Sequence, residues 1–470
     1  MPQVHTIRGV PMTLQRDSWW LTDAPPGQNP ITRAKGSVLA LIALLLLGDQ
    51  LFWHHPPGLS LALFAVAIFA ATANRATPLS ATLLTLSVLP VIEYVQPLSL
   101  VILGLGLPTA IALNRGLAPL PALVALIRRL PFALPGALAT GVRHLPAGQS
   151  RSLLRNWGFP LGGMLVLLSL LAQANPVLAG WIAVLTTLPL DPVDLALRAL
   201  FWAGLALILW PLLTPTPSAA LTLTLPRLTT GLNATSVTNA LVLFNGVLAL
   251  QLGLDALYLF GTTTPPGMTL ATYAHRGAYP LLATALLAGA FALAARPWLA
   301  EKPRLTPLLL LWLGQNVVLT LSALYRLHLY VQSFGLTYLR VDAAIWLGLV
   351  AAGLALTGVQ IALHRPNRWL LLHCTVLAVA TLYACAFLNF AAVIARVNLA
   401  QDKIDAQYLC DLGPTAAAEL AHAPYWVVSH CPNSQPQILG WRDWGFRNWR
   451  VRRYLDQHMP ERPLEDSRRG

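Results

Sequence analysis

The chain has 470 residues, of which 56% are hydrophobic and 10% are charged, and its mean hydropathy is +0.60. Soluble domains usually carry about 25% charged residues, so this composition excludes an ordinary soluble enzyme and favours an all-α integral membrane protein. The formal net charge of +13 is scattered between apolar runs and not gathered in one domain, which argues against a nucleic-acid-binding protein.

In chain order, the apolar runs predict a polytopic helical bundle of about eleven transmembrane helices. The polar segment 1–37 is expected to be irregular and cytoplasmic, and an uncleaved first helix is expected from Val38 to about Trp53. Further runs of spanning length lie near residues 58–73, 78–95, 98–114, 159–175, 194–213, 236–259, 278–295, 305–326, 341–363 and 369–395. Prolines bracket the run 176–190, which favours a re-entrant or interfacial segment and leaves a span open.

The lysines and arginines of the loops predict the orientation. With the N-terminus in the cytoplasm, the cytoplasmic loops hold most of the basic residues, including six arginines in the loop 115–157. The predicted domains are then a transmembrane region, 38–396, in a bacterial inner membrane, and a C-terminal region, 397–470, outside the cytoplasm. The loop 115–157 has no acidic residue, so we expect an amphipathic segment on the inner leaflet or a topology signal alone.

Local signals in the C-terminal region are helical. Residues Ile404–Leu412 are periodic, Gly413 stands where a helix commonly ends, and Pro414 suits the first turn of the next helix. A further helix is predicted from Trp441 to Leu455, where three tryptophans are mixed with five arginines. This mixture suits either an interfacial helix on the outer leaflet or a helix docked on the rest of the region.

The four cysteines fall into two pairs of different expected role. Cys410 and Cys431 lie in the exported region, where a disulfide between them is chemically permitted and free thiols are the alternative. A bridge closing that loop stabilises the folded state by about 3 kcal/mol. Cys374 and Cys385 lie within the last predicted span and are expected to be buried packing residues.

Charged groups within or at the ends of the predicted spans are the most informative residues, because a charge in hydrocarbon costs at least about 2.5 kcal/mol. With the predicted orientation they all lie toward the outer side. The candidate ligand-binding residues chosen on this ground are Asp49, Glu93, Asp255, Arg276, Arg326, Arg340, Asp342 and Arg396. They either pair to fix helix packing or meet in a polar cavity where the arginines bind phosphate or carboxylate.

No motif in the chain indicates a reaction. The sequence has no G-x-x-x-x-G-K-[ST] phosphate loop, no H-E-x-x-H, no C-x-x-C and no G-x-S-x-G. We therefore predict no catalytic residue, no metal site and no cofactor, and regard an enzyme as the less favoured class.

Four stretches resemble a known family. They are LYRLHLYVQSFGLTYLR (324–340), FLNFAAVIARVNL (387–399), DAQYLCDLGPTAAAEL (405–420) and GWRDWGFRNWRVRRYL (440–455). Together they resemble a bacterial polytopic membrane family known only as a domain of unknown function, and the resemblance implies no reaction. The shared residues are Tyr325, Arg326, Tyr330, Gly335, Thr337, Arg340, Asn389, Arg396 and Asn398. They add Tyr325 to the candidate ligand-binding residues.

The leading hypothesis is a non-enzymatic inner-membrane protein with an outward-facing polar cavity. Its expected partners are the lipid bilayer, an anionic envelope lipid or glycolipid, and a protein partner of the C-terminal region. The first alternative is an enzyme of envelope-lipid or glycan transfer with Asp49 or Glu93 as the base. A transporter is weakened by the lack of a clear repeat, and a membrane component of signalling has no feature of its own.

Overall fold

The computed structural model describes residues 30–72, 77–130, 192–214, 233–259, 270–299, 302–428, 431 and 435–458, together with a few single residues between 160 and 171. Every regular element in these ranges is a helix, and no strand occurs among them. The all-α class that the apolar runs predict is therefore confirmed for the part of the chain that the structure describes.

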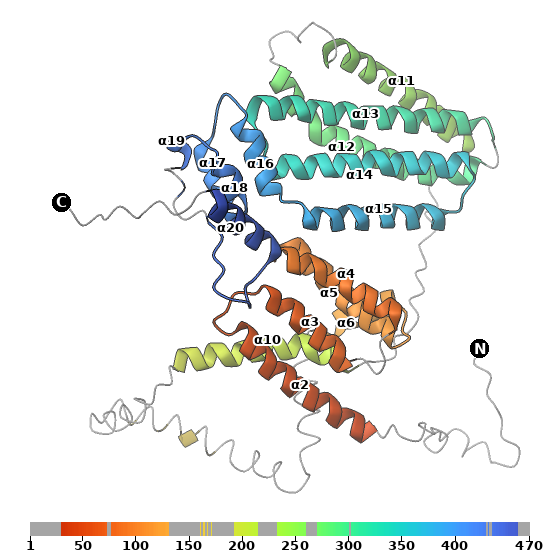
Figure 1. Cartoon of the computed structure of the whole chain (residues 1–470). Helices are drawn as coiled ribbons and strands as arrows, with labels where there is room; N and C mark the ends of the chain where they lie inside the picture. Colours follow the sequence, from red (N-terminus) through yellow and green to blue (C-terminus); the bar gives the residue numbers. More distant parts are fainter. Residues whose placement is uncertain are drawn as a thin grey trace, which may run out of the picture. The chain divides into compact units, whose positions relative to one another are not determined.

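The chain forms two compact units, whose helices are drawn in Figure 1. The first unit comprises Met1–Val91, Val101–Leu221 and Trp441–Asp443. The second comprises Ile92–Leu100, Thr222–Gly440 and Trp444–Gly470. Each unit therefore draws on separate stretches of the sequence.

In the first unit, three helices pack against one another. The unit contains α2 (Pro30–Phe52), α3 (Leu59–Thr72), most of α4 (Pro78–Glu93) and α5 (Pro97–Asn114), α6 (Pro119–Arg129) and α10 (Pro192–Leu213). Helix α10 packs against α2 and α3. Gly48 allows this close approach, because a Cβ atom at that position would lie 2.7 Å from Leu205 Cδ1. Thr77 caps α4 through a reciprocal pair of hydrogen bonds with Ser80.

The second unit contains a helical bundle centred on α13. Its helices are α11 (Ala234–Leu259), α12 (Leu270–Ala295), the 3-10 helix η3 (Arg296–Leu299), α13 (Leu305–Phe334), α14 (Tyr338–Ala362) and α15 (Asn367–Phe387). Helix α13 packs against α11, α12 and α14, and α14 packs against α15 (Figure 1). Leu309 and Leu313 of α13 meet Leu241 of α11 in a core that also includes alanines of α12, namely Ala285, Ala288, Ala292 and Ala295. Small residues at this spacing let neighbouring helices approach closely.

The remaining helices form a C-terminal cap at one end of α13, α14 and α15 (Figure 1). The cap consists of α16 (Phe390–Leu399), α17 (Ala406–Asp411), η4 (Pro414–Ala416), α18 (Ala417–Leu420), α19 (Tyr425–Val428) and α20 (Phe446–His458). Its core contains the fully buried Ile394 and Leu409. Helix α20 packs on α18, because Val451 and Leu455 contact Ala417.

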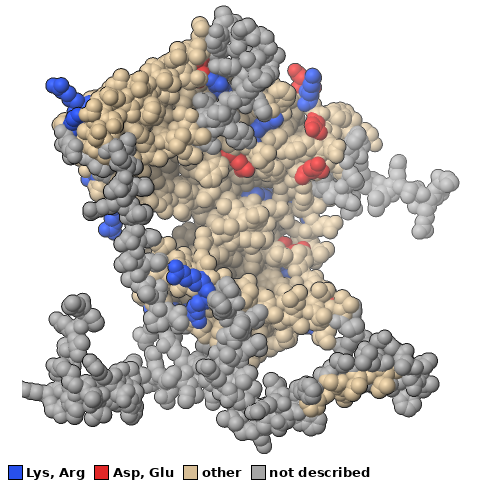
Figure 2. Space-filling view, turned by 180° about the vertical axis from the view of Figure 1, so that it is seen from behind, with Lys and Arg blue, Asp and Glu red and all other residues tan. Residues whose placement is uncertain are grey.

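Several helices are long and apolar enough to cross a membrane. By length and composition these are Pro97–Asn114, Val193–Leu213, Ala234–Leu257, Leu305–Phe334, Tyr338–Ala362 and Asn367–Phe387. Shorter apolar helices are Val38–Phe52, Leu59–Thr72, Pro78–Glu93, Ala283–Ala295 and Phe390–Leu399. The helices expose many large apolar side chains, and charged residues are sparse on the face in Figure 2, as suits helices in contact with lipid.

Five boundaries differ from the sequence-based expectations. Two predicted spans are longer than expected, because α12 begins at Leu270 and not near residue 278, and α13 ends at Phe334 and not near Arg326. Helix α2 begins at Pro30 and not near Val38, since proline is compatible with a first helical turn. The predicted span 369–395 is two helices, because Asn389 caps α16 by accepting a hydrogen bond from the backbone N–H of Ala392. Helix α20 begins at Phe446 and not at Trp441, after Gly445, whose carbonyl accepts the first helical hydrogen bond.

Other expectations about the chain are met or lie outside the described residues. The periodic stretch near 404–412 contains α17, Gly413 follows it with a φ of +81°, and η4 begins at Pro414. A positive φ after a helix is the conformation that glycine adopts most readily. The runs 159–175 and 176–190, and the segment 131–159 of the basic loop, fall outside the described residues except for single positions.

Candidate functional site

The bundle of the second unit holds a buried ion pair. Asp255 of α11 and Arg326 of α13 are joined by a salt bridge, and their exposed fractions are 1% and 4%. Ser322 donates a hydrogen bond to Asp255 Oδ2 at 2.5 Å, and Gln251 donates from Nε2 to Oδ1 at 2.8 Å. The carboxylate is thus surrounded by donors, which is the condition under which a charge is tolerated in an apolar bundle.

A comparable pair lies within the first unit. Arg198 of α10 binds the carboxylate of Asp49 of α2 with two hydrogen bonds, of which the one from Nε to Oδ1 measures 2.7 Å. Trp202 donates from Nε1 to the same Oδ1 at 2.8 Å. The sequence-based list contained Asp49 but not Arg198. The sequence contained a signal for Arg198, because it is a charged residue inside the apolar run 194–213, one helical turn before Trp202.

Glu93, at the end of α4, is shared by two arginines of α20. Arg447 Nε lies 3.2 Å and Arg450 Nη2 lies 3.4 Å from Glu93 Oε1. Arg447 is buried and also donates to the carbonyl of Ala386 at the end of α15. Burial lowers the pKa of Arg447, and the hydrogen bond to Glu93 acts in the opposite direction. One carboxylate thus faces two guanidinium groups, which leaves excess positive charge at this point.

The turn between α13 and α14 is clamped by Asn398 of α16. Its Oδ1 accepts a hydrogen bond from the N–H of Leu336 at 2.6 Å, and its Nδ2 donates to the carbonyl of Leu336 at 2.9 Å. Gly335 has a φ of +77°, and a Cβ there would lie 2.9 Å from Asn398 Oδ1, so both conformation and space require glycine. Arg340 closes the turn by donating to the carbonyls of Phe334 and Gly335.

The substitution Asn398→Ala is expected to lower the free energy of unfolding by about 1–3 kcal/mol. The reason is that both backbone groups of Leu336 lose their partner in a half-buried turn. Thermal unfolding of the purified full-length protein measures the effect. Gln401→Ala is the control, because Gln401 makes a single bond of 3.2 Å to the carbonyl of Val331. Equal losses in the two variants would contradict the clamp.

The remaining family-resembling residues of α16 connect this helix to the rest of the cap. Arg396 binds Glu419 through both carboxylate oxygens, with Nε 3.2 Å from Oε2. The side chain of Arg396 is 73% exposed, so the pair contributes little to stability. Asn389 Nδ2 donates to the carbonyl of Thr415 at 2.8 Å. These residues shape the cap and hold it together.

A disulfide joins Cys410 to Cys431, whose Cα atoms are 5.0 Å apart. It connects α17 to the chain after α19, beside the buried side chain of Leu409. Cys374 and Cys385 are free cysteines of α15, the first partly exposed and the second buried.

Helix α20 presents a basic and aromatic surface on the side that does not pack against α18. This surface, the α20 strip, consists of Phe446, Trp449, Arg450 and Arg453. The rings of Phe446 and Trp449 stack with centroids 5.6 Å apart. The guanidinium of Arg450 lies 5.4 Å from the Phe446 ring, and that of Arg453 lies 5.2 Å from the Trp449 ring. The aromatic faces thus hold two exposed arginines side by side.

The remaining candidate residues are Asp342, Tyr325 and Arg276. Asp342 is exposed near the start of α14, and Tyr325 is 38% exposed on α13. Arg276 lies in α12, at a position where the side chain is not described. Among the described residues the candidate set is distributed over separate pairs, and no group of three or more His, Cys, Asp or Glu side chains is placed to hold a metal ion.

The partners of the candidate charged residues were largely missed in the sequence. Arg447 and Glu419 pair with candidate residues, yet each lies hundreds or tens of residues from its partner. Only the presence of lone charges next to apolar runs pointed toward such pairs. Sequence spacing gave no means of choosing which charges would meet.

Fold and site together define a multi-pass helical protein whose apolar helices are joined by a few internal ion pairs. The family model for a domain of unknown function, DUF4153, matches residues 37–423, so the chain belongs to this family. This confirms the resemblance, and the stretch 440–455 lies beyond the matched residues. Comparison with curated proteins and with solved structures gave no match.

Proposed function

We propose that this protein is a multi-pass bacterial inner-membrane protein that binds the anionic head group of an envelope lipid at its C-terminal cap. The N-terminus is cytoplasmic, and the cap, most of which belongs to the region 397–470, lies outside the cytoplasm. The contact surface is the α20 strip, and the chemistry recognised is a phosphate group. A glycolipid that carries a phosphate meets the same requirement.

Two observations support this orientation. The loops assigned to the cytoplasm contain most of the basic loop residues. The disulfide between Cys410 and Cys431 favours an oxidising compartment for the cap, because cytosolic proteins generally keep their thiols reduced. The transmembrane region 38–396 then connects the two sides.

The α20 strip is the observation that carries the proposal. Helix α20 contains four arginines and one acidic residue, Asp456. Its first turns meet Glu93 and Ala386, the ends of two apolar helices, so the strip lies where α4 and α15 stop being apolar. Tryptophan and arginine are favoured at that level of a membrane, where the ring contacts the acyl boundary and the guanidinium contacts head groups.

Arg450 is placed to exchange one anion for another. Its side chain is 54% exposed, and its bond to Glu93 measures 3.4 Å, while Arg447 remains on the same carboxylate at 3.2 Å. A phosphate bound at the strip therefore replaces Glu93 as the partner of Arg450, and Glu93 remains paired with Arg447. Arginine suits this role because its planar donors bind two oxygens at once.

The variants Arg450→Gln and Arg453→Gln are each expected to weaken binding of phosphatidylglycerol about ten-fold. A charge-assisted hydrogen bond contributes about 1.5–3 kcal/mol, and exposure of the strip favours the lower end. Native mass spectrometry of the purified full-length protein, titrated with phosphatidylglycerol and with phosphatidylcholine, gives the two affinities.

The matched control is Arg452→Gln. Arg452 is on the same helix and exposed, but it donates to the carbonyl of Ile438 and does not belong to the strip. Loss of affinity in all three variants alike would indicate a general charge effect. Capture of a protein by the cap, with no preference for the anionic lipid, would replace the lipid by a protein partner.

A further inference from the structure

A series of polar side chains connects the N-terminal end of α10 to the C-terminal end of α2 within the first unit. Along α10, Asp194, Arg198 and Trp202 follow one another at intervals of four residues, so they lie on one face of the helix. His54, just after α2, has its Nε2 atom 3.2 Å from Asp194 Oδ1. Arg198 and Trp202 both donate to the carboxylate of Asp49 of α2. These five residues form the α2–α10 ladder.

The end of α2 places His54 in the ladder. The N–H of Trp53 still bonds to the carbonyl of Asp49 at 3.0 Å, and His54 follows with a φ of +59°. Pro56 and Pro57 come next and do not permit the helix to continue. The chain therefore turns at His54, and the imidazole lies against the first turn of α10.

Two members of the ladder are accessible at the surface. The side chain of Asp194 is 39% exposed, and that of Arg198 is 40% exposed. Arg198 uses Nε and Nη2 to bind Asp49, which is itself 5% exposed, so the guanidinium is held in place and Nη1 is not used in this pair. Asp194 Oδ2 is likewise not used in the contact with His54. An acceptor and a donor thus lie one helical turn apart on an accessible face of α10.

The ladder has an excess of acid in a basic chain. With histidine counted as neutral, its two carboxylates share the single guanidinium of Arg198. The segment Trp441–Asp443 contacts this end of α2 through a bond of 3.0 Å between Arg442 and His55, and it adds one charge of each sign. The chain as a whole has a formal net charge of +13. A local excess of negative charge attracts a cationic group.

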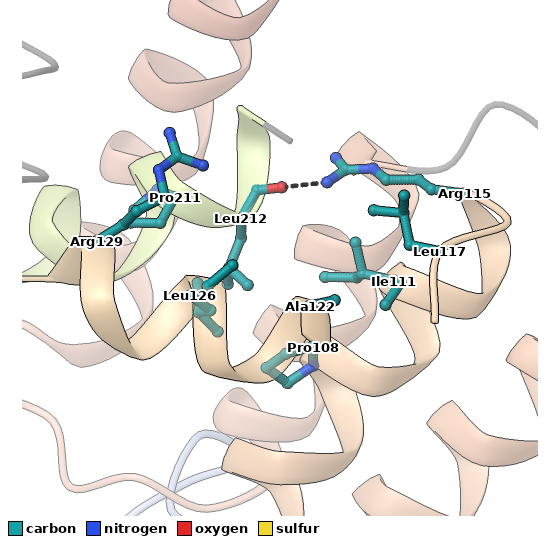
Figure 3. A pocket seen from close by; sticks show the side chains of 11 residues that line it. Pro108, Ile111, Arg115, Leu117, Ala122, Leu126, Arg129, Pro211 and Leu212 are labelled. Carbon is teal, nitrogen blue, oxygen red and sulfur yellow. Dashed lines mark hydrogen bonds between the residues drawn. The ribbon is translucent and has the colours of Figure 1, made fainter. Parts of the chain in front are cut away.

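The opposite end of α10 has the reverse charge. Arg115, just after α5, donates from Nη1 to the carbonyl of Leu212 at 2.8 Å, and Arg129 of α6 donates to the carbonyl of Thr214 at 2.6 Å. Figure 3 shows both arginines around this end of the helix. Basic residues are concentrated at the cytoplasmic ends of membrane-spanning helices. The ladder therefore lies at the end of α10 that the proposed orientation places outside the cytoplasm.

Helix α10 exposes large aliphatic side chains next to the ladder. Leu195, Leu197 and Leu200 are 57%, 54% and 69% exposed, and the helix is long and apolar enough to cross a membrane. Trp202 is 36% exposed, and Trp53 is partly exposed. Tryptophan at the end of an apolar helix is typical of the level at which acyl chains meet head groups. The polar groups of the ladder thus lie beside a surface suited to acyl chains.

We propose that the α2–α10 ladder binds the head group of an amine-bearing phospholipid, phosphatidylethanolamine. The ammonium group donates to Asp194, and the phosphate accepts from Arg198 Nη1. A short two-carbon bridge joins the two groups in this head group, which suits side chains one helical turn apart. The acyl chains contact the exposed leucines of α10. The site uses no residue of the α20 strip, so it does not rest on the function proposed for that strip.

The test is native mass spectrometry of the purified full-length protein, titrated with phosphatidylethanolamine, phosphatidylcholine and phosphatidylglycerol. The Arg450→Gln/Arg453→Gln chain serves as the parent, so that failure of the α20 strip leaves the result unaffected. In this parent we expect phosphatidylethanolamine to bind about ten-fold more tightly than phosphatidylcholine. The reason is that the methyl groups of choline remove the N–H donors of the ammonium group.

Asp194→Asn is expected to weaken binding of phosphatidylethanolamine about ten-fold, because the charge-assisted hydrogen bond is lost. The substitution keeps the size of the side chain and leaves the buried pair of Asp49 and Arg198 intact. Asp342→Asn is the matched control, because Asp342 is exposed near the start of another long apolar helix, α14, and has Trp346 four residues later in place of an arginine. Its affinity is expected to stay within two-fold of the parent.

A second variant, Asp194→Lys, gives an independent result because it reverses the charge of the accessible group. The lysine repels the ammonium group and attracts an anionic head group. This variant is therefore expected to bind phosphatidylglycerol more tightly than phosphatidylethanolamine. A variant that still preferred phosphatidylethanolamine would contradict the role of Asp194.

The other outcomes also decide the proposal. A preference for phosphatidylethanolamine that is lost in Asp194→Asn and kept in Asp342→Asn supports the ladder as the site. Equal affinity of the parent for phosphatidylethanolamine and phosphatidylcholine would overturn recognition of the ammonium group. Equal binding of soluble phosphoethanolamine at the same concentration would overturn the lipid as the ligand. An equal loss in Asp194→Asn and Asp342→Asn would overturn the ladder as the site.

Discussion

Replacing Arg326 by alanine is expected to destabilise the protein by about 3–5 kcal/mol, more than any other single substitution considered for the bundle. The substitution leaves the carboxylate of Asp255 at 1% exposure without the guanidinium of Arg326, while Ser322 and Gln251 still donate to it. Breaking a buried pair costs more than the pair itself contributes, because one charge remains buried. Thermal unfolding of the purified chain in detergent measures the loss.

The double variant Asp255→Leu/Arg326→Met distinguishes a buried charge from lost packing. Replacement of both partners by apolar residues of similar size is often neutral, so most of the stability is expected to return. A double variant as unstable as Arg326→Ala would show that packing around Arg326 accounts for the loss. An Arg326→Ala chain as stable as the parent would contradict the ion pair.

Removing the disulfide, by Cys410→Ser/Cys431→Ser, is expected to destabilise the cap by about 3 kcal/mol. The two cysteines are 21 residues apart, and a loop of that length gains this much conformational entropy when it opens in the unfolded state. Limited proteolysis of the full-length protein follows the cap, and cleavage should become several-fold faster in the residues between α17 and α19.

The free cysteines provide the control for this prediction. Cys374→Ser and Cys385→Ser change thiols of α15, which take no part in the bridge. Their proteolysis pattern is expected to match the parent chain. If the bridged pair remained reduced in protein isolated under thiol-blocking conditions, both the bridge and the proposed location of the cap would be contradicted.

Much of the helical architecture could be predicted because a membrane-spanning helix has a strong sequence signal. Apolar runs such as 305–326 and 341–363 correspond to α13 and α14, since apolar composition over that length has few other structural solutions. Gly413 and Pro414 likewise marked a helix end through their backbone preferences. These features are local, and local sequence decides them.

The break in the run 369–395 shows where this approach fails. The run is apolar throughout, so composition alone predicts one span. The interruption at Asn389 depends on a hydrogen bond to Ala392 within α16 and another to Thr415 in the cap. Thr415 is distant in sequence from Asn389, so the periodicity of the run does not indicate this contact.

The sequence identified the candidate residues one by one but did not show which of them pair. Charges in apolar runs identified Asp255 and Arg326 without showing that they meet. The partners of Glu93 lie on α20, a helix outside the apolar runs. The arginines of this helix were expected at a membrane interface or on a docked helix, and not beside Glu93. Long-range pairing is set by the packing of helices, which a single sequence does not specify.

The structure also gives a physical role to several residues that the chain shares with its family. Gly335, Arg340 and Asn398 belong to one turn and its clamp, where a positive φ, two carbonyls and an amide fit together. Asn389 and Arg396 connect α16 to the rest of the cap. These five shared residues therefore fix the junction between the bundle and the cap.

The most direct test of the proposed function is a density map of the full-length protein in a nanodisc containing phosphatidylglycerol. Head-group density is expected within hydrogen-bond distance of Arg450 and Arg453, with the rings of Phe446 and Trp449 at the acyl boundary. This density is expected to be lost in Arg450→Gln/Arg453→Gln. An α20 strip that faces bulk water with no lipid beside it, or head-group density unchanged in that double variant, would contradict the proposal.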